Sequence, residues 1–136
     1  STSSSVATIP VTSRCLIEKL SYKEDKVNFI IPIGATINMD GTALFECVVV
    51  IFIAQLYGID LSFIEQLLIL LLALITSIGV AGIPSASFVA IIVILGAVGL
   101  PFEAVGIIIG IDRLLDMLRT SVNVYGDTCC VSIVAK

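Results

Sequence analysis

Residues 3–10 read SSSVATIP and residues 77–84 read SIGVAGIP, so the pattern S-x-x-V-A-x-I-P occurs twice. Each copy interrupts the hydrophobic pattern with small residues just ahead of an apolar run. Irregular backbone at membrane depth must be buried in protein or line a watery cavity, because lipid offers it no hydrogen-bond partner. The repeat therefore predicts two hairpin tips, each followed by a half-helix whose positive N-terminal end can hold an anion.

The composition is typical of a membrane protein. Hydrophobic residues make up 58% of the 136 and charged residues 13%, and no charge stands between Glu65 and Glu103. An average soluble domain carries about 25% charged residues, so we reject a soluble globular fold. The chain has no histidine, which argues against an enzyme with a nucleophile–base pair. Its opening residues form neither a signal peptide nor a natural start, so we expect a fragment of a longer protein.

Apolar runs and charged loops divide this all-α membrane protein into seven segments. We expect the tip and second arm of hairpin one at 1–13, a cytoplasmic loop at 14–26, a transmembrane helix broken at NMDG over 27–57, an extracellular loop at 58–65, hairpin two at 66–100, a turn at 101–103 and a last transmembrane helix at 104–136. The stretch 66–100 exceeds one span of about 20 residues, which favours a re-entrant hairpin. Four basic residues place 14–26 in the cytoplasm. The two hairpins then open on opposite sides, an inverted repeat typical of secondary transporters.

Polar side chains form one stripe on the last helix. The stripe is spaced by four, three, four and four residues, which keeps one helical face polar: Asp112, Asp116, Arg119, Asn123 and Asp127. A charge at membrane depth costs roughly 2.5–3.5 kcal/mol, so this face does not meet lipid. One interpretation is a self-neutralising ladder in which Asp116 pairs with Arg119. The other is a binding site, because Asn123 and Asp127 have no basic partner downstream within a turn and oxygen groups suit a hard cation.

Glu46 stands alone among apolar residues of the broken span. Desolvation disfavours the charged form of such a carboxyl, which makes Glu46 a candidate proton carrier. A Glu46 that is permanently neutral, or paired with a helix outside this chain, fits the sequence equally well.

Four motifs together resemble the glutamate transporter family, the excitatory amino-acid transporters and their prokaryotic sodium–aspartate relatives. The motifs are the two repeats, GATINMDGTALFE at 34–46, and D-x-x-x-D-x-x-R-T-x-x-N-x-x-G-D at 112–127. The resemblance implies the C-terminal half of the transport domain of a multi-pass plasma-membrane protein that forms a homotrimer. It implies sodium-coupled symport of acidic amino acids, with H⁺ and K⁺ as further candidate coupling ions. A neutral amino-acid or dicarboxylate carrier of the same fold, or an anion-conducting channel, remain alternatives.

The resemblance also implies roles for individual residues. Ser5, backbone around Ser3 and the Asn123 amide would meet the substrate α-carboxylate. Asp116 and Thr120 would hold its α-amino group, and Arg119, near Thr42, would take its side-chain carboxylate. The lid over the substrate would be backbone at Val80, Gly82 and Ile83.

For sodium the resemblance implies three sites. The first would use Gly34, Asn38, Asn123 and Asp127, and the second Thr36, Met39, Ser77, Ile78 and Val80. The third would use Asn38 and Asp40 with groups outside the chain. Glu46 would couple H⁺ and K⁺. Animal members carry an arginine at the position of Met117 and archaeal members one at Ser3, and we expect Arg113 to replace both.

Overall fold

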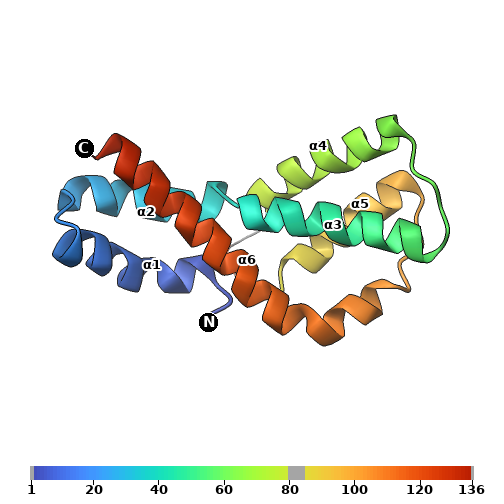
Figure 1. Ribbon diagram of the computed structural model, residues 1–136, viewed down its shortest axis with the longest axis horizontal. Helices are drawn as coiled ribbons and strands as arrows, with labels where there is room; N and C mark the ends of the chain where they lie inside the picture. The colour runs from blue at the N-terminus through green and yellow to red at the C-terminus, as the bar shows by residue number, and fades with distance from the viewer. Residues whose placement is uncertain (1, 80–84, 136) are drawn as a thin grey trace.

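A computed structural model describes residues 2–79 and 85–135, and over these residues the chain is helical, without strands (Figure 1). The predicted all-α class is therefore confirmed. The inverted orientation of the two hairpins stays a prediction, and the predicted lid at Val80, Gly82 and Ile83 lies outside the described residues. The helices are α1 (Ser5–Arg14), the π-helical turn η1 (Cys15–Lys19), α2 (Glu24–Ile37), α3 (Asp40–Leu56), α4 (Phe63–Gly79), α5 (Ser87–Val98) and α6 (Val105–Val134).

Helix α1 begins at the first copy of the repeat and is continuous through Pro10. A proline in the interior of a helix commonly kinks or breaks it. An interior proline costs about 3 kcal/mol because it removes one backbone hydrogen bond. The Ser4 side chain caps the helix by accepting from Ala7 N–H at 3.0 Å, and α1 packs against α2 and α6. These interactions hold the helix together across Pro10.

The broken span has its interruption where the sequence placed it, but the interruption is shorter. Only Asn38 and Met39 are non-helical, and Asp40 already lies in the first turn of α3. A carboxylate at that position is stabilised by the positive helix N-terminus. The run Glu24–Leu56 is long and apolar enough to cross a membrane by length and composition, whereas α4 and α5 are shorter apolar helices.

Helix ends differ from the predicted loop boundaries on both sides of the broken span. Within the predicted loop 14–26, only residues 20–23 are non-helical. Helix α4 starts at Phe63, inside the predicted loop 58–65, because Ser62 and Glu65 form a capping box: Ser62 N–H donates to Glu65 Oε2 at 2.7 Å and Glu65 N–H to Ser62 Oγ at 3.3 Å. Charged residues marked the solvent-facing positions but not where the helices end.

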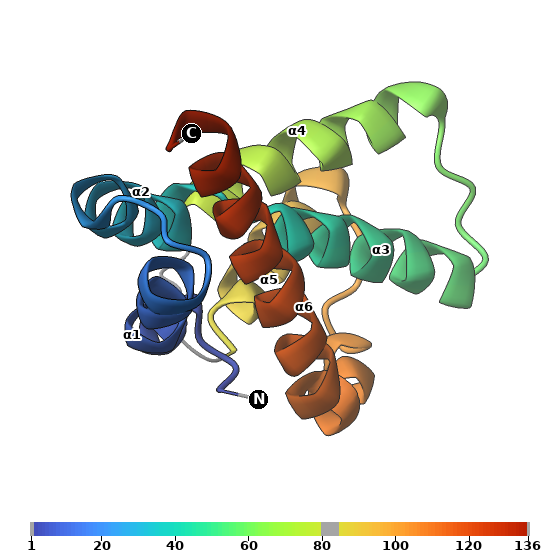
Figure 2. The same ribbon diagram turned by 60° about the vertical axis from the view of Figure 1, so that its left-hand side comes forward.

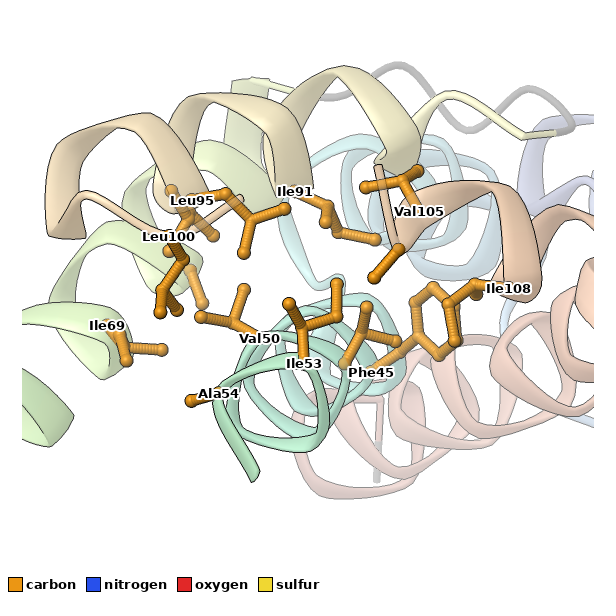
Figure 3. Packing of buried hydrophobic residues seen from close by; sticks show 14 residues of the cluster. Phe45, Val50, Ile53, Ala54, Ile69, Ile91, Leu95, Leu100, Val105 and Ile108 are labelled. Carbon is orange, nitrogen blue, oxygen red and sulfur yellow. The ribbon is translucent and has the colours of Figure 1, made fainter. Parts of the chain in front are cut away.

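Helix α6 crosses the whole molecule (Figures 1 and 2) and joins its two halves. It packs against α1 and α2 on one side and against α3 on the other, where α4 and α5 complete the layer. The larger apolar core lies among α3, α4, α5 and the start of α6, and includes Phe45, Ile53, Ile91 and Ile108 (Figure 3). A smaller core gathers Leu16, Val27, Ile31, Val131 and Ala135. The polar stripe of α6 therefore lies between two apolar cores.

The outer surface carries many large apolar side chains. Phe63 is 79% exposed, and Ile75 and Val89 are each 68% exposed. Soluble monomers rarely present apolar surface on this scale, whereas a bilayer or neighbouring transmembrane segments cover it readily. This surface supports the membrane class predicted from composition.

Candidate functional site

The polar stripe of α6 is buried along its entire length. Asp112, Asp116, Arg119, Asn123 and Asp127 are each no more than 6% exposed. A buried charge is costly unless it is paired and hydrogen-bonded. The stripe divides into two groups of contacts, which differ in how their charges are compensated.

The first group, which we call the charged cluster, consists of Asp112, Asp116 and Arg119. Arg119 Nη2 lies 3.1 Å from Asp112 Oδ1 and 2.6 Å from Asp116 Oδ1, and the guanidinium carbon lies 4.0 Å from the centre of the Phe45 ring. Arg119 Nη1 has no hydrogen-bond partner within residues 2–79 and 85–135. The ion pair weighed from the sequence is thus present, and one guanidinium nitrogen still lacks an acceptor.

The charged cluster borders one small cavity. Its walls come from the start of α1, the helix break and α6: Ser3, Ser4, Ser5, Met39, Thr42, Asp116, Arg119, Thr120 and Asn123. All the predicted substrate residues that the structure describes therefore lie around a single space. Its volume is about 20 Å³, enough for one water molecule but not for an amino acid. A larger ligand requires the cavity to widen.

The start of α1 meets this cavity in an unusual conformation. Ser3 has φ of +54° and is buried, and its hydroxyl has no hydrogen-bond partner among the described residues. A positive φ is uncommon for a residue with a side chain. The positive end of the α1 dipole also lies at the cavity, since Ser5 is both its first residue and part of the wall.

The second group, the amide cluster, consists of Asn38, Asn123 and Asp127. Asn38 Nδ2 donates to Asp127 Oδ1 at 3.0 Å, and Asn123 Oδ1 accepts from Gly41 N–H at 2.8 Å. The Asn123 amide nitrogen lies 3.2 Å from Thr42 Oγ1 and 3.3 Å from the Met39 sulfur. No cation forms an ion pair with Asp127 in the described part of the chain, where both salt bridges belong to Arg119.

Glycine lets the helices approach closely at the amide cluster. A Cβ on Gly34 would lie 2.3 Å from Asp127 Oδ1, and one on Gly126 would lie 2.6 Å from Asn38 Nδ2. Neither distance is compatible with a side chain unless the polar groups move. Three of the four residues of the first predicted sodium site, Gly34, Asn38 and Asp127, therefore lie in direct contact.

The other predicted sodium residues are less closely assembled. The Thr36 side chain is exposed and its hydroxyl donates to Ile33 O at 2.8 Å, and Ser77 donates to Leu74 O at 3.1 Å. Met39 is buried at the break, whereas Asp40 and Ile78 are exposed. Across residues 2–79 and 85–135, no three His, Cys, Asp or Glu side chains are grouped to hold a metal ion. A cation here would depend on carbonyl and amide oxygens.

Three residues that the sequence left without a role contact the site. The Ser85 hydroxyl donates to Asp112 Oδ2 at 2.9 Å and its N–H to Asp116 Oδ2 at 3.3 Å. Phe45 stacks on Arg119, and Thr76 donates to Glu46 Oε2 at 2.8 Å. Ser85 follows the second repeat directly, which was a usable signal. The contacts of Phe45 and Thr76 depend on tertiary packing.

The prediction for Arg113 is not supported. Its side chain is exposed. Because it follows Asp112 by one residue, it points about 100° away from the stripe. Met117 follows Asp116 by one residue and diverges from the stripe in the same way. Arg119 is therefore the arginine that the polar stripe contains.

Comparison with known proteins gives the same answer as the motifs. The model of the sodium:dicarboxylate symporter family matches residues 1–136. The chain belongs to this family. It is 52% identical over 134 residues to excitatory amino acid transporter 3 of Mus musculus, and 50% identical over 133 residues to both an excitatory amino acid transporter of Caenorhabditis elegans and excitatory amino acid transporter 2 of Homo sapiens.

These matches cover 98% of the chain but only 26%, 26% and 23% of the respective relatives. The chain thus spans about a quarter of their length. The family resemblance predicted from the sequence is confirmed, and the family and these relatives are transporters rather than enzymes.

Proposed function

We propose that the protein containing this chain is a secondary active transporter of the plasma membrane that couples sodium entry to the uptake of glutamate or aspartate. The observation that carries the proposal is the small cavity between the α1 N-terminus, Arg119 and Asp116. An acidic amino acid has two carboxylates and one ammonium group. The cavity walls offer a complementary set: two positive features and one carboxylate.

The substrate groups are assigned by this complementarity. Arg119 leaves the carboxylates of Asp112 and Asp116 and receives the substrate side-chain carboxylate through its planar fork. Asp116, released from Arg119, takes the ammonium group with Thr120. Ser3, Ser5 and Asn123 meet the α-carboxylate, and the segment around Val80, Gly82 and Ile83 closes over it. A neutral substrate would leave Arg119 without its anion, and a dicarboxylate without an amino group would leave Asp116 without its cation.

Sodium is assigned to the amide cluster. Asp127 supplies the negative charge, and Gly34, Asn38 and Asn123 supply carbonyl oxygens, which hard cations prefer. The close contact of Gly34 with Asp127 supports this assignment, because a residue with a side chain could not bring its backbone this near to the carboxylate. The second site uses Thr36, Met39, Ser77, Ile78 and Val80, and the third uses Asn38 and Asp40 with groups elsewhere in a homotrimeric protein.

Glu46 is assigned to proton and potassium coupling. Its side chain is fully buried, at 0% exposed, and one carboxyl oxygen has no hydrogen-bond partner in the described residues. Protonated Glu46 crosses with the substrate, and ionised Glu46 returns with potassium. The Glu46→Gln variant should keep sodium-dependent exchange of labelled for unlabelled substrate but lose net uptake. Net uptake with the parent's dependence on pH and internal potassium would reduce Glu46 to a structural acid.

Radiolabelled aspartate and glutamate uptake tests the proposal as a whole. The full-length protein is reconstituted in proteoliposomes with and without an inward sodium gradient, and alanine and succinate serve as competitors. We expect uptake only with the gradient and little competition from either analogue. Uptake that does not depend on the sodium gradient would contradict sodium coupling. Strong inhibition by alanine or succinate would favour a neutral amino-acid or dicarboxylate carrier.

A further inference from the structure

Among the described residues, the carboxyl of Glu46 has one hydrogen-bonding neighbour from another helix. Glu46 lies in the middle of α3, and its Oε2 accepts from the hydroxyl of Thr76 on α4 at 2.8 Å. Thr76 is one residue before the second repeat. The contact therefore links the proposed proton carrier to the arm that leads into hairpin two.

The hydroxyl of Thr76 has a second acceptor at the same distance. Thr76 Oγ1 lies 2.8 Å from Leu72 O and 3.3 Å from Ala73 O, both on its own helix. A hydroxyl has a single hydrogen but two acceptor lone pairs, so it donates to one of these groups at a time. Glu46 and the α4 carbonyls thus compete for the same hydrogen.

This competition gives Oε2 of Glu46 a hydrogen bond in each protonation state, whereas Oε1 has no partner among the described residues in either one. When Glu46 is ionised, Thr76 donates its hydrogen to Oε2, which is a charge-assisted bond. When Glu46 binds a proton from water, the carboxyl O–H donates to Thr76 Oγ1, and the threonine hydrogen turns to Leu72 O. No heavy atom moves between the two arrangements.

Among the described residues, few other charged or titratable groups lie near Glu46. On α6, the charge of Arg119, which is itself paired with Asp112 and Asp116, acts on Glu46 through space, and on α3 the titratable neighbour of Glu46 is Cys47. Helix α5 has no titratable side chain, and the one on α4, Glu65, lies at the opposite end from Thr76. Thr76 is thus the hydrogen-bonding neighbour that distinguishes the two states.

We propose that Thr76 is the positioning residue of the proton-coupling carboxyl, and that its hydroxyl sets the pH at which Glu46 releases its proton. This inference rests on the proposed role of Glu46 in coupling. Without the hydroxyl, the ionised carboxylate loses its donor while the protonated form loses only an acceptor. Proton release then requires a higher pH.

The test compares three substitutions in the full-length protein. Thr76→Val removes the hydroxyl and keeps the size of the side chain. Thr76→Ala removes the hydroxyl and shortens the side chain, and Thr76→Ser keeps the hydroxyl. Alanine also favours helix, so this variant is available if the valine variant does not fold. Net uptake and substrate exchange are measured across a pH series, with Glu46→Gln in the same preparation.

We expect the pH profile of net uptake in the valine and alanine variants to move up by about one unit, a tenfold change in proton affinity, as loss of one charge-assisted bond implies. Exchange should be unchanged, and the serine variant should match the parent. Parental profiles in both hydroxyl-free variants, or an equal shift in the serine variant, would overturn the role of Thr76 while leaving that of Glu46 intact. If Glu46→Gln keeps the parent's pH dependence, the proposed role of Glu46 fails and this inference fails with it.

Discussion

The charged cluster and the amide cluster lie on the same face of α6, yet their charges are compensated in opposite ways. In the charged cluster, Arg119 contacts both Asp112 and Asp116 within 3.1 Å. In the amide cluster, Asp127 receives only an amide hydrogen from Asn38 and no side-chain cation in the described chain. A buried charge needs a partner. The first cluster already contains one, whereas the second contains no side-chain cation among the described residues.

This difference separates the two proposed tasks. A ligand at the charged cluster has to replace the ion pairs of Arg119 with Asp112 and Asp116. Its charged groups must therefore match these pairs in number and sign, and this requirement gives specificity for the substrate. A cation at the amide cluster replaces only the amide contact with Asp127, so it adds net stabilisation. Asn123 belongs to the amide cluster and also lines the cavity beside the charged cluster, and thereby links the two.

The largest effect is expected when the charged cluster loses its cation. Arg119→Cys should reduce acidic amino-acid affinity by 10²-fold or more, because a charge-assisted pair contributes about 1.5–3 kcal/mol per hydrogen bond. Sodium binding should persist. Equilibrium binding of labelled aspartate and of sodium to the full-length protein measures both, and Arg113→Cys, an exposed arginine on the same helix, is the matched control. Unchanged aspartate affinity in the Arg119 variant would remove Arg119 from the site.

A somewhat smaller effect is expected when the amide cluster loses its charge. Asp127→Asn should weaken sodium and aspartate binding together, each by about tenfold or more, because the two ligands are thermodynamically linked. The control is Asp25→Asn, which removes an exposed carboxylate from the first turn of α2. If aspartate affinity fell while sodium affinity stayed at the parent value, Asp127 would belong to the substrate site instead.

Gly34 tests the geometry of the amide cluster without changing its charge. The added Cβ in Gly34→Ala would meet Asp127 Oδ1 and force the carboxylate aside. We expect sodium affinity to fall by roughly tenfold, an effect of about 1.4 kcal/mol. Gly110→Ala is the control, since nothing lies within 4 Å of a Cβ there. Equal behaviour of the two variants in a sodium titration would show that the close approach has no part in binding.

Glu65 gives the exposed reference for these buried carboxylates, and its effect should be the smallest. Hydrogen bonds from the Ser62 hydroxyl and N–H lower the pKa of Glu65. The stability that a lowered pKa provides is present above the unfolded pKa of about 4.3 and is lost as the pH falls through the folded value. Glu65→Gln should thus lower the melting temperature slightly at neutral pH and not in acid, with sodium and aspartate affinities unchanged. A melting difference that grew as the pH fell would reverse the sign of this interaction.

The sequence predicted the features that depend on pattern. The spacing of five polar residues was sufficient to place them on one face, and the composition and repeat were sufficient to predict a helical membrane protein with a break near Asn38. Helix ends were less predictable, because the Ser62–Glu65 capping box starts α4 inside a predicted loop. The continuity of α1 through Pro10 depends on tertiary packing that the position of the proline does not reveal. The contacts of Thr76 with Glu46, and of Phe45 with Arg119, join side chains across separate helices or turns, and no spacing rule links them.

Linkage between the two clusters is the central claim, and equilibrium binding tests it most directly. Aspartate affinity of the full-length protein is measured over a range of sodium concentrations, and sodium affinity is measured with and without aspartate. We predict that aspartate affinity rises steeply with sodium and that aspartate raises sodium affinity by the same factor. Aspartate binding of equal affinity in the presence and absence of sodium would contradict the account.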